Sequence, residues 1–218
     1  MQVVRHRKWF FAISAALVLA SLVSLVMFRL NPGIDFTGGA AISLQYESAV
    51  SAGQITDAMA EVDQKDAIIQ RAGGNTFFIR LGELQLDERD DAGKVITRGD
   101  ESRVRDALTG IAQGEIESFD SVSGVIGAEN VRNATVAVIV ASFVILVYVT
   151  WAFRRVPSPF RYGLAAVIAL VHDVLIVLGV FSVLGETVSL EVNAMFITGV
   201  LTTIGYSVND TIVVFDRL

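Results

Sequence analysis

The chain has 218 residues, of which 53% are hydrophobic and only 18% are charged, and its formal net charge at pH 7 is −6. A soluble domain usually has about 25% charged residues, so this composition is unusual for a soluble protein. The absence of cysteine excludes disulfides, thiolate nucleophiles and cysteine metal sites. Nucleic-acid binding is disfavoured because the sequence has no basic patch that could meet phosphates.

Four long apolar stretches, the first beginning close to the N-terminus, predict membrane spans: residues 9–28, 134–153, 163–184 and 193–215. Each approaches or exceeds the ~20 residues that a helix needs to cross ~30 Å of hydrocarbon. The first stretch is too long for the apolar part of a secretory signal, and no small-x-small cleavage site follows it. We therefore predict an uncleaved anchor.

A glycine-containing connector follows the first span, over residues 31–39. Pro32 and Gly33 end the helix as it leaves the membrane, and Gly38 and Gly39 permit backbone angles closed to other residues. Asp35 lies between the two pairs. We interpret this segment as a rigid connector in preference to a contact for a substrate.

The region between the first two spans, residues 31–133, predicts one small α+β domain. Apolar periodicity predicts strands and helices in the order β-α-β-β-α-β, which is the ferredoxin-like arrangement. The segments are residues 40–46, 52–62, 67–70, 76–81, 102–111 and 116–122, with a turn at 72–75. Residues 85–98 predict an acidic loop. This domain shows no convincing catalytic or metal-binding set, since both histidines lie elsewhere.

The distribution of basic residues predicts the orientation in the membrane. Arg5, Arg7 and Lys8 precede the first span, and three arginines lie between the second and third spans: Arg154, Arg155 and Arg161. By the positive-inside rule, both segments are cytoplasmic. The predicted organisation is a first span with a basic cytoplasmic start (1–30), an extracytoplasmic domain (31–133) and three further spans (134–218). Because the chain stops directly after a span, we expect it to be part of a longer protein.

Two aspartates, Asp173 and Asp210, lie inside otherwise apolar stretches. A carboxylate in hydrocarbon costs roughly 2.5–3.5 kcal/mol even on lenient insertion scales, so such residues usually have a use. One hypothesis is an ion or proton path, because a carboxylate in a low-dielectric site can bind and release a proton as a neighbouring helix moves. The alternative is a fixed ion-pair or hydrogen-bond partner that holds helices together.

Asp210 shares a helical face with Thr203 and Tyr206, at i, i+3 and i+7, and Asn209 flanks this polar stripe. A polar stripe is costly against lipid, so we expect it to face another helix or a water-filled crevice. For Asp173 a proton relay and a structural acceptor for groups on the fourth span remain equal alternatives. His172 is interpreted as a packing or hydrogen-bonding residue in preference to a relay, and Ser207 and Thr211 are expected to bond to backbone carbonyls.

Three motifs of this chain resemble the SecF family: residues 33–39 (GIDFTGG), residues 204–217 (IGYSVNDTIVVFDR) and, more loosely, residues 171–173 (VHD). The resemblance implies six spans, of which this sequence supplies four, in the plasma (inner) membrane of a bacterium. It implies work beside SecD and the Sec protein-conducting channel, driving export of unfolded polypeptide with protons, or with sodium ions as in some relatives. No covalent chemistry and no cofactor are implied, so we expect a non-enzyme.

In the family, a basic residue on the next helix is thought to face the carboxylate that matches Asp210, and that residue cannot be assigned in this sequence. Two rival functions stay open. One is a proton-coupled exporter of small molecules or lipids from the same superfamily, although a domain of ~100 residues is small for an apolar substrate pocket. The other is a membrane anchor that displays a binding domain and has no need of Asp210.

Overall fold

The computed structural model describes residues 6–89 and 95–217. The chain forms two compact units, one of residues 34–130 and one that combines the residues up to Gly33 with those from Val131 onward. Arg5 and Leu218, which entered the sequence-based topology, lie outside the described residues. We refer to the two parts as the sheet unit and the helical unit.

The helical unit is built from long apolar helices. Within the described part of the chain, three helices are long and apolar enough to cross a membrane: α1 (Arg7–Met27), α5 (Gly124–Ala152) and α6 (Pro159–Val188). They contain most of the first three predicted spans, although α5 and α6 are longer than predicted. The residues of α5 up to Asn130 belong to the sheet unit.

The fourth predicted span forms helix α7 (Ala194–Phe215), but α7 is not among the helices apolar enough to cross a membrane. Its second half carries Tyr206, Ser207, Asn209 and Asp210, which lower its mean hydropathy. Three of the four predicted spans are therefore helices that could cross a membrane by length and composition, and the fourth span stays a prediction.

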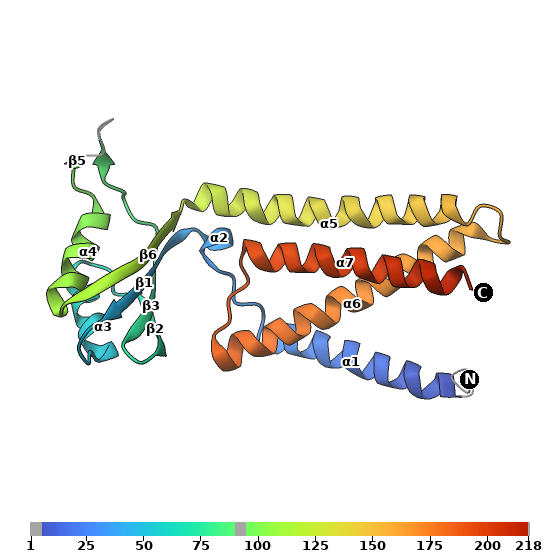
Figure 1. Ribbon diagram of the computed structural model, residues 1–218, viewed down its shortest axis with the longest axis horizontal. Helices are drawn as coiled ribbons and strands as arrows, with labels where there is room; N and C mark the ends of the chain where they lie inside the picture. Colours follow the sequence, from blue (N-terminus) through green and yellow to red (C-terminus); the bar gives the residue numbers. More distant parts are fainter. Residues whose placement is uncertain (1–5, 90–94, 218) are drawn as a thin grey trace. The chain divides into compact units, whose positions relative to one another are not determined.

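Helix α6 packs against both α1 and α7 (Figure 1). Small residues form the contact with α1: a side chain at Gly179 would overlap Ser21. Hydrogen bonds join the same surfaces, because Ser24 Oγ donates to the Gly179 carbonyl at 3.1 Å and Ser182 Oγ donates to the Ser24 carbonyl at 2.9 Å. Close approach through small residues is a usual way to pack helices in membranes.

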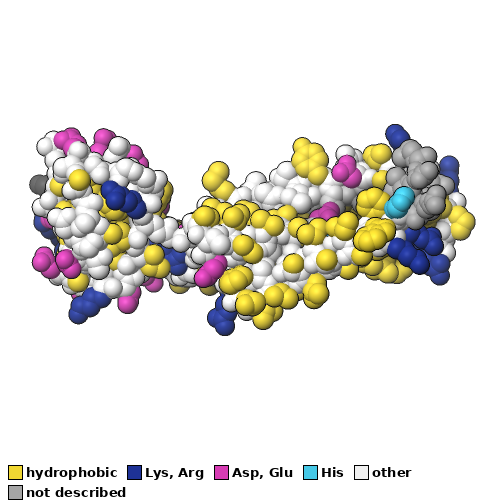
Figure 2. Space-filling view, turned by 90° about the horizontal axis from the view of Figure 1, so that it is seen from below, with side chains coloured by type: hydrophobic (Ala, Val, Ile, Leu, Met, Phe, Trp, Pro, Cys, Tyr) yellow, Lys and Arg dark blue, Asp and Glu magenta, His cyan; other side chains and the backbone are white. Residues whose placement is uncertain are grey.

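One end of the helical unit brings together the start of α1, the turn between α5 and α6, and the end of α7 (Figure 1). Three aromatic rings join the helices there: Tyr162 stacks on Phe153 at 5.4 Å between ring centroids and meets Phe215 edge-on at 5.0 Å. Figure 2 shows Lys and Arg side chains gathered at this end, whereas hydrophobic side chains cover much of the visible helical surface.

The sheet unit contains a four-stranded antiparallel sheet with the strand order β2-β3-β1-β6. Its main elements follow one another as strand, helix, two strands, helix and strand. They are β1 (Gly39–Tyr46), α3 (Ala52–Glu61), β2 (Ile68–Gly73), β3 (Thr76–Leu81), α4 (Asp100–Ile111) and β6 (Gly114–Val122). All six predicted segments are present, and β2 extends three residues beyond its predicted end into the predicted turn.

The acidic segment 85–98 is more ordered than the sequence predicted. It contains a small antiparallel pair, β4 (Glu88–Arg89) and β5 (Val95–Thr97), while residues 90–94 lie outside the described residues. Asp87 explains part of this order, since its carboxylate accepts hydrogen bonds from the Gly99 amide at 2.8 Å and from the Ser102 hydroxyl. A carboxylate is favourable at a helix N-terminus, so Asp87 stabilises the start of α4.

The core of the sheet unit lies between the sheet and helices α3 and α4. Ile55 and Met59 from α3, and Val104 and Leu108 from α4, are fully buried. They belong to one hydrophobic cluster with side chains of the sheet, chiefly Ile42, Leu44, Phe77 and Ile79. Helix α3 begins with a capping box in which Ser51 and Gln54 satisfy each other's backbone amides.

Tyr46, at the end of β1, provides a pH-dependent test of this core. Its buried hydroxyl donates to the Leu108 carbonyl at 2.9 Å, and desolvation raises its pKa to about 12. Above pH 10 the unfolded chain ionises Tyr46 first, so the free energy of unfolding should fall as the pH rises from 10 towards 12. Denaturant titrations across this range should show a smaller fall in Tyr46→Phe. An equal fall in both proteins would contradict the assignment.

Candidate functional site

Asp173 and His172 lie in the middle of α6 and connect it to both helices packed against it. Asp173 Oδ2 accepts a hydrogen bond from the Ser207 hydroxyl of α7 at 2.6 Å. Asp173 Oδ1 lies 2.8 Å from His172 Nδ1, and His172 Nε2 lies 2.6 Å from Ser14 Oγ of α1. The four side chains form a continuous hydrogen-bonded chain from α1 through α6 to α7.

The four hydrogen-bonded side chains are partly buried, and those of His172 and Asp173 are 31% and 39% exposed. The contact with Ser207 matches one of the two roles that the sequence left open for Asp173, that of a hydroxyl acceptor. Its role as a proton relay stays a prediction. His172 makes hydrogen bonds, as interpreted from the sequence.

Two neighbouring hydroxyl residues of α7 behave differently from each other. Thr211 donates to the Ser207 carbonyl one turn back at 2.8 Å, as expected. The expectation for Ser207 is wrong, because its hydroxyl donates to Asp173 instead. The reason is tertiary: Ser207 lies on the side of α7 that faces α6, where a carboxylate competes successfully with a backbone carbonyl.

Asp210 lies on α7 one turn beyond Ser207. Asp210 and Asn209 are exposed, Tyr206 is 68% exposed, and Thr203 is half-buried and donates to the Gly199 carbonyl at 3.0 Å. Among the described residues, the Asp210 side chain forms neither a hydrogen bond nor an ion pair. No direct hydrogen bond joins it to Asp173.

The exposure of Asp210 follows from how α7 packs. Phe196, Val200 and Ile204 are its buried residues, spaced four apart, so they define the face turned inward. The polar stripe of Thr203, Tyr206 and Asp210 is displaced from that face. Among the described residues no helix covers Tyr206 and Asp210, so the expectation that the stripe faces another helix or a water-filled crevice stays a prediction.

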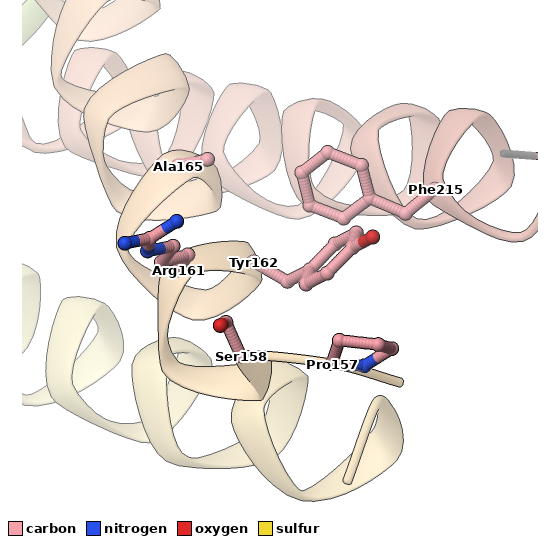
Figure 3. Close-up of a pocket in the computed structure, with 6 residues that line it drawn as sticks. All are labelled: Pro157, Ser158, Arg161, Tyr162, Ala165 and Phe215. Atoms are coloured by element: carbon pink, nitrogen blue, oxygen red, sulfur yellow. The ribbon is translucent and has the colours of Figure 1, made fainter. Parts of the chain in front are cut away.

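Two cavities in the helical unit are lined by neither aspartate. One, of about 450 Å³, lies between α6 and α7 and is lined by apolar residues together with Glu191, Asn193 and Thr203. The other, of about 430 Å³, lies at the basic end of the unit, where Tyr162 and Phe215 form part of its wall beside Arg161 and Ser158 (Figure 3). Among the described residues, no three histidine or acidic side chains are grouped closely enough to hold a metal ion.

The glycine connector makes tight backbone contacts. The Gly33 amide donates to the Val192 carbonyl at 2.8 Å. Gly38 and Gly39 have φ angles of 74° and 118°, which L-residues rarely adopt. A Cβ at Gly38 would lie 2.7 Å from the Gly124 Cα, and the Asp35 carbonyl accepts from Asn130 Nδ2 at 2.9 Å. These contacts favour the structural interpretation of the motif.

Sequence reasoning did not identify Ser14 and assigned Ser207 a different partner. One signal was present for both: each is a hydroxyl residue in a stretch predicted to cross the membrane. That signal is weak, because serine in such helices commonly bonds to its own backbone.

Comparison with known proteins decides the family. The family model of the protein export membrane protein SecD/SecF, C-terminal, matches residues 103–218, and that of the SecD/SecF GG motif matches residues 23–50. The protein translocase subunit SecF of Anaerolinea thermophila is 36% identical over the whole of this chain and 68% of the relative. The chain belongs to the SecF family. A SecF of Thermobaculum terrenum is 34% identical and is covered over 69% of its length.

A solved structure and a fused relative extend the SecF comparison. The crystal structure of SecDF from Thermus thermophilus, described as a translocon-associated membrane protein, matches the whole chain with a TM-score of 0.76 and 29% identity. This chain covers 27% of that structure. The SecDF subunit of Bacillus subtilis is 31% identical over 97% of this chain and 26% of the relative. The chain thus matches about two thirds of separate SecF subunits and about a quarter of fused SecDF proteins.

Proposed function

We propose that this protein is a SecF subunit that works with SecD to promote export of unfolded polypeptide through the Sec channel, driven by the proton gradient. The observation that supports this most directly is the similarity to SecF subunits over the full chain, including the connector motif and the helix that carries Asp210. The fused SecDF of Bacillus subtilis makes SecD the natural partner.

The fold supports a more specific arrangement. We infer that the sheet unit is a ferredoxin-like domain, because helices alternate with strands in the order strand, helix, two strands, helix, strand and the sheet order is β2-β3-β1-β6. We also infer that α7 is a fourth membrane helix, since it packs along α6, a helix apolar enough to cross a membrane. The basic end of the helical unit would face the cytoplasm of a bacterial inner membrane, with residues 31–133 outside.

In this proposal Asp210 and Asp173 bind the coupling ion, and Thr203, Tyr206 and Asn209 line the path. Asp210 is exposed on α7 and would be costly against lipid. Its polar stripe therefore requires a covering surface, which SecD or a further helix of SecF would provide. Moving one charge across ~100 mV supplies about 2.3 kcal/mol, enough to bias a helix movement.

The proposed partners are SecD, the Sec channel, the exported polypeptide and the lipid bilayer, with no nucleic acid. Protons are the proposed coupling ion and sodium ions the alternative. No covalent chemistry enters the mechanism, so the protein acts as a transport subunit and not as an enzyme, and needs no cofactor.

Export in membrane vesicles that contain the full-length protein and SecD tests the function. We expect translocation of an unfolded precursor to slow severalfold when the protein is removed, and to respond to the proton gradient only when it is present. Collapsing the sodium gradient instead distinguishes the two ions. Unchanged export without the protein would contradict the proposal, and gradient-dependent efflux of a small molecule would favour the rival exporter function.

A further inference from the structure

The chain Ser14–His172–Asp173–Ser207 is the most connected polar feature of the helical unit. It joins three helices through three hydrogen bonds of 2.6–2.8 Å. No other charged residue lies between Lys8 in α1 and Arg29, which follows that helix, or between Arg161 and Glu186 in α6. Helix α7 has two titratable side chains, which are those of Asp210 and Tyr206. His172 and Asp173 thus form an isolated titratable pair.

The hydrogen-bonding capacity of each atom determines where the protons lie. When Asp173 is ionised its carboxylate can only accept, so the observed contacts make it receive one hydrogen bond from Ser207 and one from His172 Nδ1–H. His172 then carries a proton on Nδ1. Its Nε2 atom either accepts from the Ser14 hydroxyl, when the ring is neutral, or carries a second proton and donates to Ser14 Oγ.

Both protonation states keep all three hydrogen bonds. In the first the pair carries a net charge of −1, and in the second the imidazolium and the carboxylate balance to zero. The change requires one added proton on Nε2 and a reversal of the Ser14 hydroxyl. Because a net charge is costly among apolar helices, proton uptake removes an electrostatic penalty without breaking a contact.

We propose that His172 and Asp173 form a proton-binding pair in which His172 Nε2 takes up the proton and the Ser14 hydroxyl of α1 reverses its hydrogen bond, while Ser207 of α7 holds the carboxylate in place. This inference rests on the proposed function, because it specifies one site at which the coupling proton binds. Asp210 lies three residues beyond Ser207 on α7, so the hydrogen bond from Ser207 connects the pair to the helix that carries the other aspartate. His172 is a proton-binding residue here, and the two serines are positioning residues.

Nuclear magnetic resonance of 15N-labelled histidine tests the pair directly in the full-length protein in lipid nanodiscs. The 218 residues contain two histidines, so His6→Gln leaves His172 as their one remaining signal, and any further histidines of the full-length protein are identified by comparison with His172→Asn. We expect neutral His172 to carry its proton on Nδ1, and lower pH to add a proton on Nε2 while Nδ1 stays protonated. A neutral ring with its proton on Nε2 would overturn the proposal.

Substitutions around His172 provide the controls. Asp173→Asn should abolish the preference for the Nδ1 proton, and Ser14→Ala should shift the Nε2 signal while leaving the Nδ1 signal in place. Thr211→Ala, on α7 but bonded to backbone, should change neither nitrogen. Identical spectra for the parent and Asp173→Asn would also overturn the proposal.

The export assay separates this inference from the function on which it rests. His172→Asn keeps a donor for Asp173 but cannot take up a proton at Nε2, so gradient-driven export should lose its dependence on pH. An unchanged pH profile in this variant overturns the proton-binding role while leaving proton-driven export intact. Export by the parent protein that does not depend on the proton gradient would contradict the proposed function. The tautomer of His172 measured by nuclear magnetic resonance would be unaffected by that result.

Discussion

Asp210→Asn is expected to abolish the stimulation of export by the proton gradient, reducing the gradient-dependent rate at least tenfold. Asparagine has nearly the same shape and keeps polar atoms on the exposed stripe of α7, but it cannot bind and release a proton. Asp210 has no hydrogen bond or ion pair among the described residues, so the substitution breaks no described contact. The measurement is precursor translocation in vesicles, with and without a gradient.

Glu186→Gln is the matched control for this experiment. It removes one exposed carboxylate near the end of α6, close to where the helix is expected to leave the membrane, and should leave export unchanged. Equal rates for Asp210→Asn and the parent protein would show that Asp210 does not carry the coupling proton. In that case the membrane-anchor alternative, which has no need of this carboxylate, would be favoured.

Phe77→Ala is expected to lower the free energy of unfolding of the sheet unit by about 3–5 kcal/mol, the usual cost of removing a large aromatic side chain from a core. Phe77 is fully buried in β3 and meets Tyr46 edge-on at 6.2 Å between ring centroids. Its truncation leaves a cavity between the sheet and the helices. Denaturant unfolding of the purified protein, followed by circular dichroism, measures the change.

The neighbouring residue supplies the control, because Phe78 points to the opposite face of the same strand and is 51% exposed. Phe78→Ala should change the free energy of unfolding by less than about 1 kcal/mol. Similar losses for both variants would contradict the strand register, since a slip by one residue would exchange the two side chains between faces.

Most of the secondary structure could be predicted because it depends on local patterns. The first three apolar stretches became helices long enough to cross a membrane, and the six predicted segments of the domain all formed. The order in segment 85–98 was not predicted because part of it comes from Asp87, which bonds to backbone amides 12 and 15 residues away at the start of α4. Contacts of that length leave no periodic signal.

The candidate site shows the same difference between residues that a local pattern reveals and contacts that it does not. Asp173 and Asp210 were recognisable because a carboxylate in an apolar stretch is costly wherever the stretch packs. The partners of Asp173 were not, since Ser14 lies 158 residues from His172 and Ser207 lies 34 residues from Asp173. Serine alone does not indicate whether it will bond to its own helix or to another.

The amino-acid sequence by itself determined which segments are helices and strands, which carboxylates are out of place in apolar surroundings, and which family the motifs resemble. These properties follow from residue type and spacing along one segment. Only the tertiary structure decided that α6 carries the pair His172 and Asp173 between two hydroxyl groups of other helices, and that Asp210 stays uncovered among the described residues. Both outcomes depend on the rotation of each helix about its axis, which buries its small and apolar faces. That rotation is set by all the packed surfaces together.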